Sequence, residues 1–273
     1  MNKVCLSLKI HGSGYCMASA NHVIKGEKRK QIRFDATWAV IKHPTEGLIM
    51  FDTGYTRRFH KATKNFPNSI YANITKVHIN KNEEAKMHVN QSEVKHIILS
   101  HLHADHVGGL LDFPNAQCWT SKKCIEEFIK TPKWRGFSKG LLHDLFPYKW
   151  EDNCKVFEDC KYDKHKILGL GYDLFGDQSI VMYGFPGHAA GQHGALIQTK
   201  ERRVLLAADA FWNIKAITHK LGPSPIVRLF FDDWKAYNNS LNTLRKFHKA
   251  HPEIPMIATH CPKTFDMIDS TEN

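Results

Sequence analysis

The sequence contains no long hydrophobic run. Its longest apolar stretches, such as Val204–Ala208, are a handful of residues, whereas a helix that crosses a bilayer needs about 20. We therefore expect no membrane span. The first ten residues also lack a long apolar core and a small-residue cleavage site, so we expect a strand over Val4–Ile10 and not a signal peptide.

Two motifs that would indicate other chemistries are missing. None of the seven cysteines forms a Cys-x-x-Cys pair, the spacing typical of structural zinc sites and redox motifs. Their odd number, without an export signal, favours reduced thiols and a cytoplasmic location over a disulfide framework. The sequence has no Gly-x-Ser-x-Gly elbow either, so nothing in it suggests a serine nucleophile.

The composition that is present is that of an ordinary globular protein. Of the 273 residues, 42% are hydrophobic, which is enough apolar surface to offset the entropy of ordering and excludes a mainly disordered chain. No repeat or linker interrupts the sequence, so we expect a single domain over residues 1–273. The net charge is +11. Because the basic residues are scattered, we expect a basic surface and no nucleic-acid partner.

Short apolar segments alternate with helical patterns along the chain. The pattern predicts helices over Ser121–Lys130 and Asp232–Ala250, the second with Tyr237, Leu241, Leu244 and His248 on its apolar face. This alternation is typical of a layered α/β fold. An apolar insertion at about residues 131–150 is either additional core or the wall of a substrate pocket. The predicted strands after the first are Ala36–Lys42, Leu48–Phe51, His96–Ser100, Gln117–Thr120, Ser179–Tyr183, Ala195–Thr199, Val204–Ala208 and Met256–Thr259.

The strongest pattern is a group of histidines directly after one predicted strand. His101, His103, Asp105 and His106 fall within six residues at the carboxyl end of His96–Ser100, the place where α/β proteins tend to carry their sites. In an extended segment the first two imidazoles share a face and can meet one ion. As the chain turns, Asp105 and His106 can reach a second ion close by. These ligands suit zinc, and also iron, manganese or cobalt.

Three further candidate ligands follow other predicted strands. His188 follows Ser179–Tyr183, Asp209 follows Val204–Ala208, and His260 follows Met256–Thr259. Each alone would be weak, because a single polar residue at a strand end is often a structural cap. Together they supply the ligands that a dinuclear site still lacks.

In this order the motifs resemble those of the metallo-β-lactamase-fold hydrolases, whose signature is His-x-His-x-Asp-His, then Gly-His, then Asp, then a late His. The resemblance spans nearly the whole chain and includes the turn at Asp52-Thr53-Gly54. It implies a four-layer αβ/βα sandwich and two divalent metal ions, zinc by default. One ion would be bound by His101, His103 and His188, and the other by Asp105, His106 and His260. Asp209 would bridge them, and Asp52 would support the ligands.

Within this family the chain is most similar to the N-acyl homoserine lactone lactonases. The segment Gly14-Tyr15-Cys16-Met17 is similar to one in that group, and the apolar insertion would suit an acyl chain. Those lactonases commonly carry a tyrosine three residues after the bridging aspartate, where this chain has Trp212. An indole N–H can donate a hydrogen bond but cannot act as a phenolic acid.

The resemblance therefore implies a metal-dependent hydrolase that acts on a small-molecule ester or lactone. A metal-bridging hydroxide oriented by Asp105 would attack the carbonyl, and Trp212 would lie beside the substrate. The substrate that the resemblance implies most directly is an N-acyl homoserine lactone, and opening its ring is quorum quenching. A thioester (as in glyoxalase II) or a phosphodiester hydrolysed at the same centre is the alternative, and a non-catalytic metal-binding scaffold is a second. The sequence leaves open the acyl-chain preference, the native metal and whether the protein forms a homodimer, as its relatives often do.

Overall fold

The computed structural model describes residues 4–264, which form two compact units. The N-terminal unit comprises residues 8–17 and 33–156, and the C-terminal unit comprises residues 4–7, 18–32 and 157–264. Each unit has its own mixed β-sheet and its own hydrophobic core. Whether the two make a single domain, as the sequence suggests, remains a prediction.

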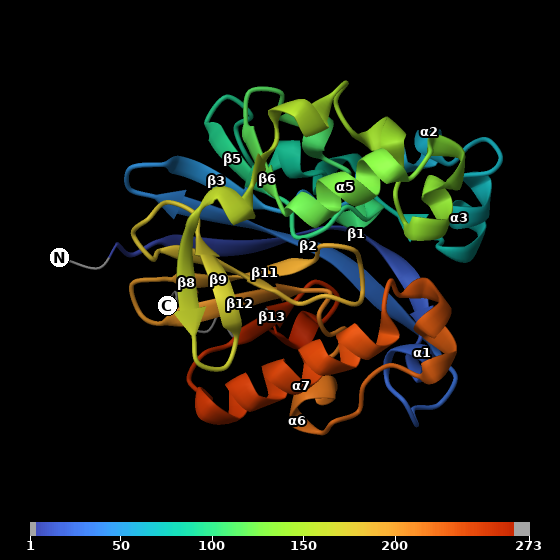
Figure 1. The fold of residues 1–273 in the computed structure, drawn as a ribbon. Helices are drawn as coiled ribbons and strands as arrows, with labels where there is room; N and C mark the ends of the chain where they lie inside the picture. The colour runs from blue at the N-terminus through green and yellow to red at the C-terminus, as the bar shows by residue number, and fades with distance from the viewer. Residues whose placement is uncertain (1–3, 265–273) are drawn as a thin grey trace. The chain divides into compact units, whose positions relative to one another are not determined.

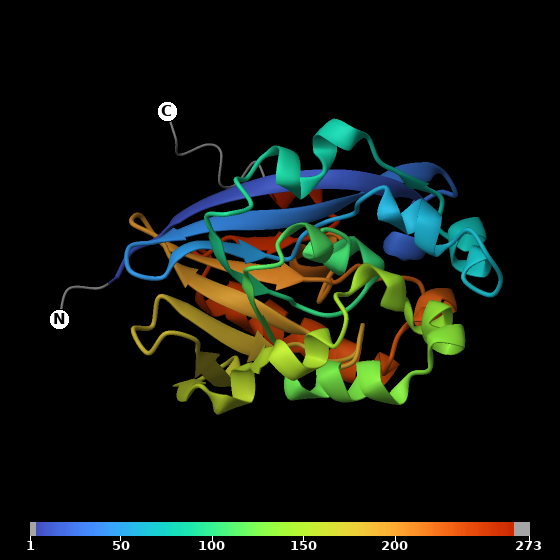
Figure 2. The same ribbon diagram turned by 90° about the horizontal axis from the view of Figure 1, so that it is seen from above.

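The N-terminal unit contains a seven-stranded sheet of order β4-β1-β2-β3-β5-β6-β7. Only the two ends of β1 and the start of β2, its two longest strands, are assigned to the other unit. The long strands β1 and β2 run side by side (blue in Figure 2). Strands β3, β5, β6 and β7 are parallel, so the chain leaves β3 and β5 at the same edge of the sheet. The strands are β1 (Ser7–Ser19), β2 (Gln31–His43), β3 (Gly47–Phe51), β4 (Val77–His78), β5 (Val94–Ile98), β6 (Gln117–Thr120) and β7 (Lys155–Val156).

Four α-helices and six short 3₁₀ segments belong to the same unit. Helix α5 starts where the Ser121 hydroxyl accepts a hydrogen bond from the Cys124 N–H, so the predicted Ser121–Lys130 helix is confirmed with Ser121 as its N-cap. The α-helices are α2 (Arg58–Ala62), α3 (Ser69–Ile74), α4 (Ala104–Val107) and α5 (Lys122–Lys130). The 3₁₀ segments are η1 (Lys81–Glu83), η2 (Ala85–Met87), η3 (Leu110–Asp112), η4 (Lys133–Lys139), η5 (His143–Leu145) and η6 (Trp150–Asn153).

The apolar insertion at residues 131–150 contributes several side chains to the core. Leu141, Leu142, Leu145 and Trp150 are buried in the cluster that also contains residues of β5 and α5. Burying side chains of this size contributes about 1.5–3 kcal/mol each. Of the two interpretations of this segment, the structure supports additional core for these residues, whereas Tyr148 is 89% exposed.

The C-terminal unit contains a six-stranded sheet of order β13-β12-β11-β10-β9-β8, antiparallel except for the β12–β13 pair. Helix α7 lies along this sheet (Figure 1). The strands are β8 (Lys161–His165), β9 (Gly169–Asp173), β10 (Ile180–Gly184), β11 (His193–Gln198), β12 (Arg203–Ala208) and β13 (Met256–Ala258). The helices are α1 (Ala20–Val23), α6 (Lys215–Thr218) and α7 (Trp234–Ala250), with 3₁₀ segments η7 (Phe157–Asp159) and η8 (Pro225–Phe230).

The predicted helix Asp232–Ala250 is confirmed as α7, with one change on its buried face. The Asp233 carboxylate caps the helix by accepting hydrogen bonds from the N–H groups of Lys235 and Ala236. Phe247, and not the predicted His248, completes the apolar face, because Phe247 is fully buried while His248 is only half-buried. No helix within residues 4–264 is long and apolar enough to cross a membrane.

Candidate metal centre

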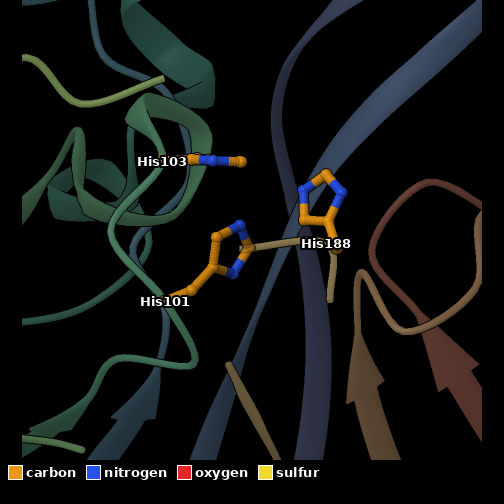
Figure 3. Close-up of side chains that lie close together, drawn as sticks. All are labelled: His101, His103 and His188. Atoms are coloured by element: carbon orange, nitrogen blue, oxygen red, sulfur yellow. The ribbon is translucent and has the colours of Figure 1, made fainter. Parts of the chain in front are cut away.

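The first group of candidate ligands lies on the loop and the short helix that follow β5. His103 is the residue before α4, and Asp105 and His106 lie in the first turn of that helix. The ring centroids of His101 and His103 are 4.5 Å apart, and those of His101 and His106 are 3.9 Å apart. The structure therefore brings together all four residues that the motif predicted, and it leaves only His103 more than 9% exposed. Figure 3 shows His101 and His103 on this loop.

A buried carboxylate holds two of these imidazoles in one protonation form. Asp52 Oδ2 lies 2.8 Å from His106 Nδ1 and accepts a hydrogen bond of 2.8 Å from the Ser100 hydroxyl. The Ser100 Oγ lies 3.1 Å from His101 Nδ1. Because the hydroxyl proton goes to Asp52, His101 Nδ1 must be the donor to Ser100, and His106 Nδ1 the donor to Asp52. Both rings then carry the lone pair on Nε2, the form in which an imidazole binds a metal.

Burial raises the pKa of Asp52, and the interaction with His106 opposes that shift. The Ser100 N–H adds a third hydrogen bond to the carboxylate, at 2.8 Å from Oδ1. Hydrogen bonds to a carboxylate favour its charged form. Asp52 also has a positive φ of 59°, an uncommon backbone conformation for a residue with a side chain. The position supports the role that the resemblance implied for Asp52.

The turn after Asp52 fixes the C-terminal end of helix α4. Thr53 donates two hydrogen bonds of 2.8 Å to the His106 carbonyl, one from its backbone N–H and one from its hydroxyl. Gly108 lies so close that an added Cβ would come within 2.6 Å of the Gly54 carbonyl oxygen. The ligand-bearing turn thus depends on a segment about 50 residues earlier in the sequence.

The apolar insertion also contacts this group of ligands. The Ala104 N–H donates a 3.2 Å hydrogen bond to the Gly140 carbonyl. A Cβ at Gly140, whose φ is 67°, would lie 2.6 Å from the His103 ring. The insertion is therefore in direct contact with a candidate ligand, which the sequence did not predict.

The second group of candidate ligands comes from three separate loops of the C-terminal unit. Asp209 follows β12, His260 follows β13, and His188 lies on the loop after β10 (Figure 3). Asp209 Oδ2 lies 2.9 Å from His260 Nε2 and 3.2 Å from His188 Nε2. All three side chains are buried. The carboxylate is thus placed between two imidazoles, as expected of a ligand that can serve two ions.

Helix α7 supports the loop that carries His188. The N–H of Asp233 donates to the Gly187 carbonyl at 2.9 Å, and the N–H of Asp232 donates to the His188 carbonyl at 3.2 Å. Gly187 has a φ of 123°, and a Cβ there would lie 2.0 Å from the Tyr237 backbone nitrogen. Only glycine fits this contact, so the loop and the helix pack backbone to backbone.

Trp212, the residue that replaces the lactonase tyrosine, lies beside Asp209. Its indole N–H donates a 3.3 Å hydrogen bond to Asp209 Oδ2. Its ring makes an edge contact with His188, with centroids 5.6 Å apart. The indole therefore contacts two candidate ligands directly.

Two aromatic residues near these ligands were not predicted from the sequence as residues of the site. Phe231 makes an edge contact with the His188 ring, with centroids 5.2 Å apart. Tyr237 packs against Phe231 at 4.5 Å, and burial together with the nearby Asp209 charge raises the pKa of its phenol. Tyr237 was predicted only as a core residue of the helix over Asp232–Ala250, and Phe231 lies just before that helix.

The donor types fit divalent metal ions. Five imidazoles and two carboxylates are the ligands that zinc, iron, manganese and cobalt accept, and the Asp52–Ser100 network presents His101 and His106 in the metal-binding form. Both groups of candidate ligands therefore offer the donor types of a metal site.

Comparison with known proteins supports this interpretation. The family model of the metallo-beta-lactamase superfamily matches residues 33–250. An N-acyl homoserine lactonase, AttM of Azorhizobium caulinodans, is 28% identical over 137 residues, which cover 47% of this chain and 48% of that protein. The "Probable metallo-hydrolase Rv2300c" of Mycobacterium tuberculosis is 23% identical over 245 residues, covering 83% of this chain and 74% of that protein. The match to the lactonase thus spans about half of that relative's length.

Solved structures share the fold. An N-acyl homoserine lactone hydrolase with the product N-hexanoyl-L-homoserine bound at its catalytic metal centre superposes with a TM-score of 0.71 at 18% identity, covering 97% of each chain. The predicted fold class, an α/β sandwich, is therefore confirmed. The family model matches most of the chain, which also carries the His and Asp residues expected of a metallo-hydrolase. The chain therefore belongs to the metallo-beta-lactamase superfamily.

Proposed function

We propose that the seven candidate ligands bind two divalent metal ions. One ion would be bound by His101, His103 and His188, and the other by Asp105, His106 and His260, with Asp209 as the bridging ligand. The observation that carries this proposal is the position of Asp209 Oδ2 between His188 Nε2 and His260 Nε2. Zinc is the default metal, with iron, manganese and cobalt as alternatives.

The reaction we propose is hydrolysis of a carboxylic ester. When bound, two such ions lower the pKa of a water molecule and polarise a carbonyl. Asp105 would orient the attacking water and accept its proton, since its carboxylate is almost buried and lies 3.4 Å from His106 Nε2. Trp212 would hold Asp209 in place through its indole N–H.

We propose a lactone, such as an N-acyl homoserine lactone, as the substrate, so that the protein acts in quorum quenching. Support comes from relatives named N-acyl homoserine lactonases at 28–29% identity, and from solved structures of the same fold that hold N-acyl homoserine products. The substrate would be a small molecule. We further propose a cytoplasmic location, in keeping with seven cysteines that form no disulfide, and a homodimer as one alternative for the oligomeric state.

Acid release by the zinc-loaded protein on a panel of acyl homoserine lactones and simple γ-lactones tests the proposal. We expect rapid ring opening that disappears in His188→Ala and is restored by zinc in the stripped wild-type protein. Stoichiometric metal binding with no hydrolysis of any ester, thioester or phosphodiester would instead indicate a metal-binding scaffold.

A thioester or a phosphodiester is the second candidate substrate. The observation that favours it is Trp212, because an indole bound to Asp209 provides no phenolic hydroxyl at the position where lactonases carry a tyrosine. Thioester or phosphodiester turnover without lactone opening would assign this substrate class to the same centre.

A further inference from the structure

Two cysteines that are 36 positions apart in the sequence lie opposite each other in the N-terminal unit. Strands β6 and β7 pair in parallel, with Trp119 opposite Lys155 and Thr120 opposite Val156. Extending this register by one position places Cys118 opposite Cys154. Residues at such positions lie on adjacent strands about 4.8 Å apart and point to the same face of the sheet.

The two thiols lie close enough to influence each other. A hydrogen bond with the Cys118 thiol, together with burial, raises the pKa of the Cys154 thiol. Both side chains pack against the same hydrophobic core and both are only partly buried, so a small oxidant can reach them. A disulfide needs Cα atoms about 4.4–6.8 Å apart, which adjacent strands provide.

Hydrogen bonds already join the two backbone segments that carry Cys118 and Cys154. The Gln117 side-chain amide donates to the Asn153 carbonyl at 2.7 Å and to the Cys118 carbonyl at 3.1 Å. These bonds hold the residue before Cys154 against the start of β6. In the described sheet β7 is an edge strand of only two residues. A covalent link here would therefore need little movement and would secure a short edge strand of the sheet.

We propose that Cys118 and Cys154 form a reversible disulfide when the protein meets hydrogen peroxide. Peroxide oxidises the sulfur of Cys118 to a sulfenic acid, and one water leaves. The Cys154 sulfur then attacks the Cys118 sulfur, the S–S bond forms, and a second water leaves. In total the two thiols lose two protons and two electrons, and one peroxide becomes two waters. The pair lies outside the proposed metal centre and does not depend on the proposed hydrolysis.

The link would close a loop that reaches the candidate ligands. Residues 118–154 include α5 and the apolar insertion, and Gly140 of that insertion packs against His103. Oxidation would therefore restrict the segment that supports His103. Closing a loop of this length stabilises the folded state, and we expect the midpoint of thermal unfolding to rise by roughly 5–10 °C.

Peptide mapping tests the proposal directly. The purified protein is treated with hydrogen peroxide, blocked with an alkylating reagent and digested with trypsin without reduction. We expect residues 96–122 to be linked to residues 150–155, and the link to disappear on reduction. Cys124, the third thiol of this region, falls on a separate peptide, residues 124–130, so the two partners are identified without ambiguity.

Cys124→Ser is the matched control. Cys124 is fully buried, whereas Cys118 and Cys154 are both partly exposed, so Cys124 should not be reached by the oxidant. The link and the rise in the unfolding midpoint should persist in Cys124→Ser and vanish in Cys118→Ser and in Cys154→Ser. A link from Cys118 to Cys124, a link between two molecules, or sulfinic acid at Cys118 with Cys154 still alkylated would each overturn the proposal.

Discussion

The two groups of candidate ligands are built in opposite ways. In the N-terminal unit, His101, His103, Asp105 and His106 come from one continuous segment, and a second segment at Asp52–Gly54 holds them in place. In the C-terminal unit, His188, Asp209 and His260 come from three loops that meet at one carboxylate. The N-terminal group depends on the neighbouring segment Asp52–Gly54 for its orientation, whereas the C-terminal group is arranged around Asp209, one of its own members.

This difference predicts that the C-terminal group is the more sensitive to a single change. Asp209→Ala removes the carboxylate that His188, His260 and Trp212 all face, so we expect bound metal to fall well below one ion per chain and hydrolysis to fall by about 10²–10³-fold or more. Metal analysis after gel filtration and turnover of the best substrate measure both. Glu253→Ala, an exposed carboxylate in the same unit, should change neither. Full metal content in Asp209→Ala would contradict a central role for this residue.

In the N-terminal group the support by neighbouring residues is tested at Asp52, which is not itself a candidate ligand. Asp52→Asn keeps the shape of the side chain but no longer fixes His101 and His106 with protons on Nδ1, so we expect metal affinity to fall about 10–100-fold. Competition with a chromophoric chelator measures this. Asp173→Asn changes another buried carboxylate, one that accepts backbone hydrogen bonds from Gly176 and Gln178, and should lower stability without changing metal affinity.

Trp212 tests whether the C-terminal group also needs outside support. Trp212→Phe removes the 3.3 Å hydrogen bond to Asp209 but keeps an aromatic ring beside His188, and we expect metal affinity to fall by roughly 3–10-fold. The chelator competition described for Asp52→Asn applies. An effect as large as that of Asp52→Asn would show that both groups depend equally on neighbouring residues.

The smallest expected effect is a pH dependence confined to the N-terminal unit. Burial, with the nearby His88, lowers the pKa of His11 from 6.5 to about 4, and its ring stacks on Trp38. The folded state therefore favours neutral His11. The contribution of His11 to the free energy of unfolding is complete above pH 6.5 and is lost as the pH falls towards 4. Because the ring is partly exposed, we expect this to be on the order of 1 kcal/mol or less. Thermal unfolding of wild type and His11→Gln between pH 7 and 4 should converge at the acidic end.

The difference between one continuous ligand segment and three separate loops explains which ligands could be predicted from the sequence. The four N-terminal ligands follow one strand at fixed spacing, so the motif alone placed them together. The C-terminal three could be predicted only from their positions at strand ends and from the family resemblance. Tyr237 carried no signal of a site, because an aromatic residue in a helical pattern usually indicates core, and Phe231 belonged to no pattern that marked it. The contact of Gly140 with His103 depends on the left-handed backbone conformation of Gly140, which no local sequence pattern indicated.

Most of the predicted strands agree with the structure within a few residues, but the two longest were predicted too short. β1 extends to Ser19, beyond the predicted end at Ile10, and β2 begins at Gln31, before the predicted start at Ala36. Four strands, β4, β7, β8 and β9, were missed. β8 reads Lys-Tyr-Asp-Lys-His and lies at the edge of its sheet, where a polar sequence is tolerated. β9 begins Gly-Leu-Gly, which indicates a turn, and β4 and β7 are two residues long. The pairing of Cys118 with Cys154 was invisible for the same reason, since it follows from the register of a strand too short to predict.

The contact between Gly187 and Tyr237 has a consequence for protein engineering. A loop graft from another member of the superfamily would bring its own residue to position 187, and any side chain there would collide with the backbone of α7. The His188 loop and the first turn of α7 therefore form one exchangeable module. Chimeras that transfer both together should keep the geometry of His188, and those that transfer either part alone should not.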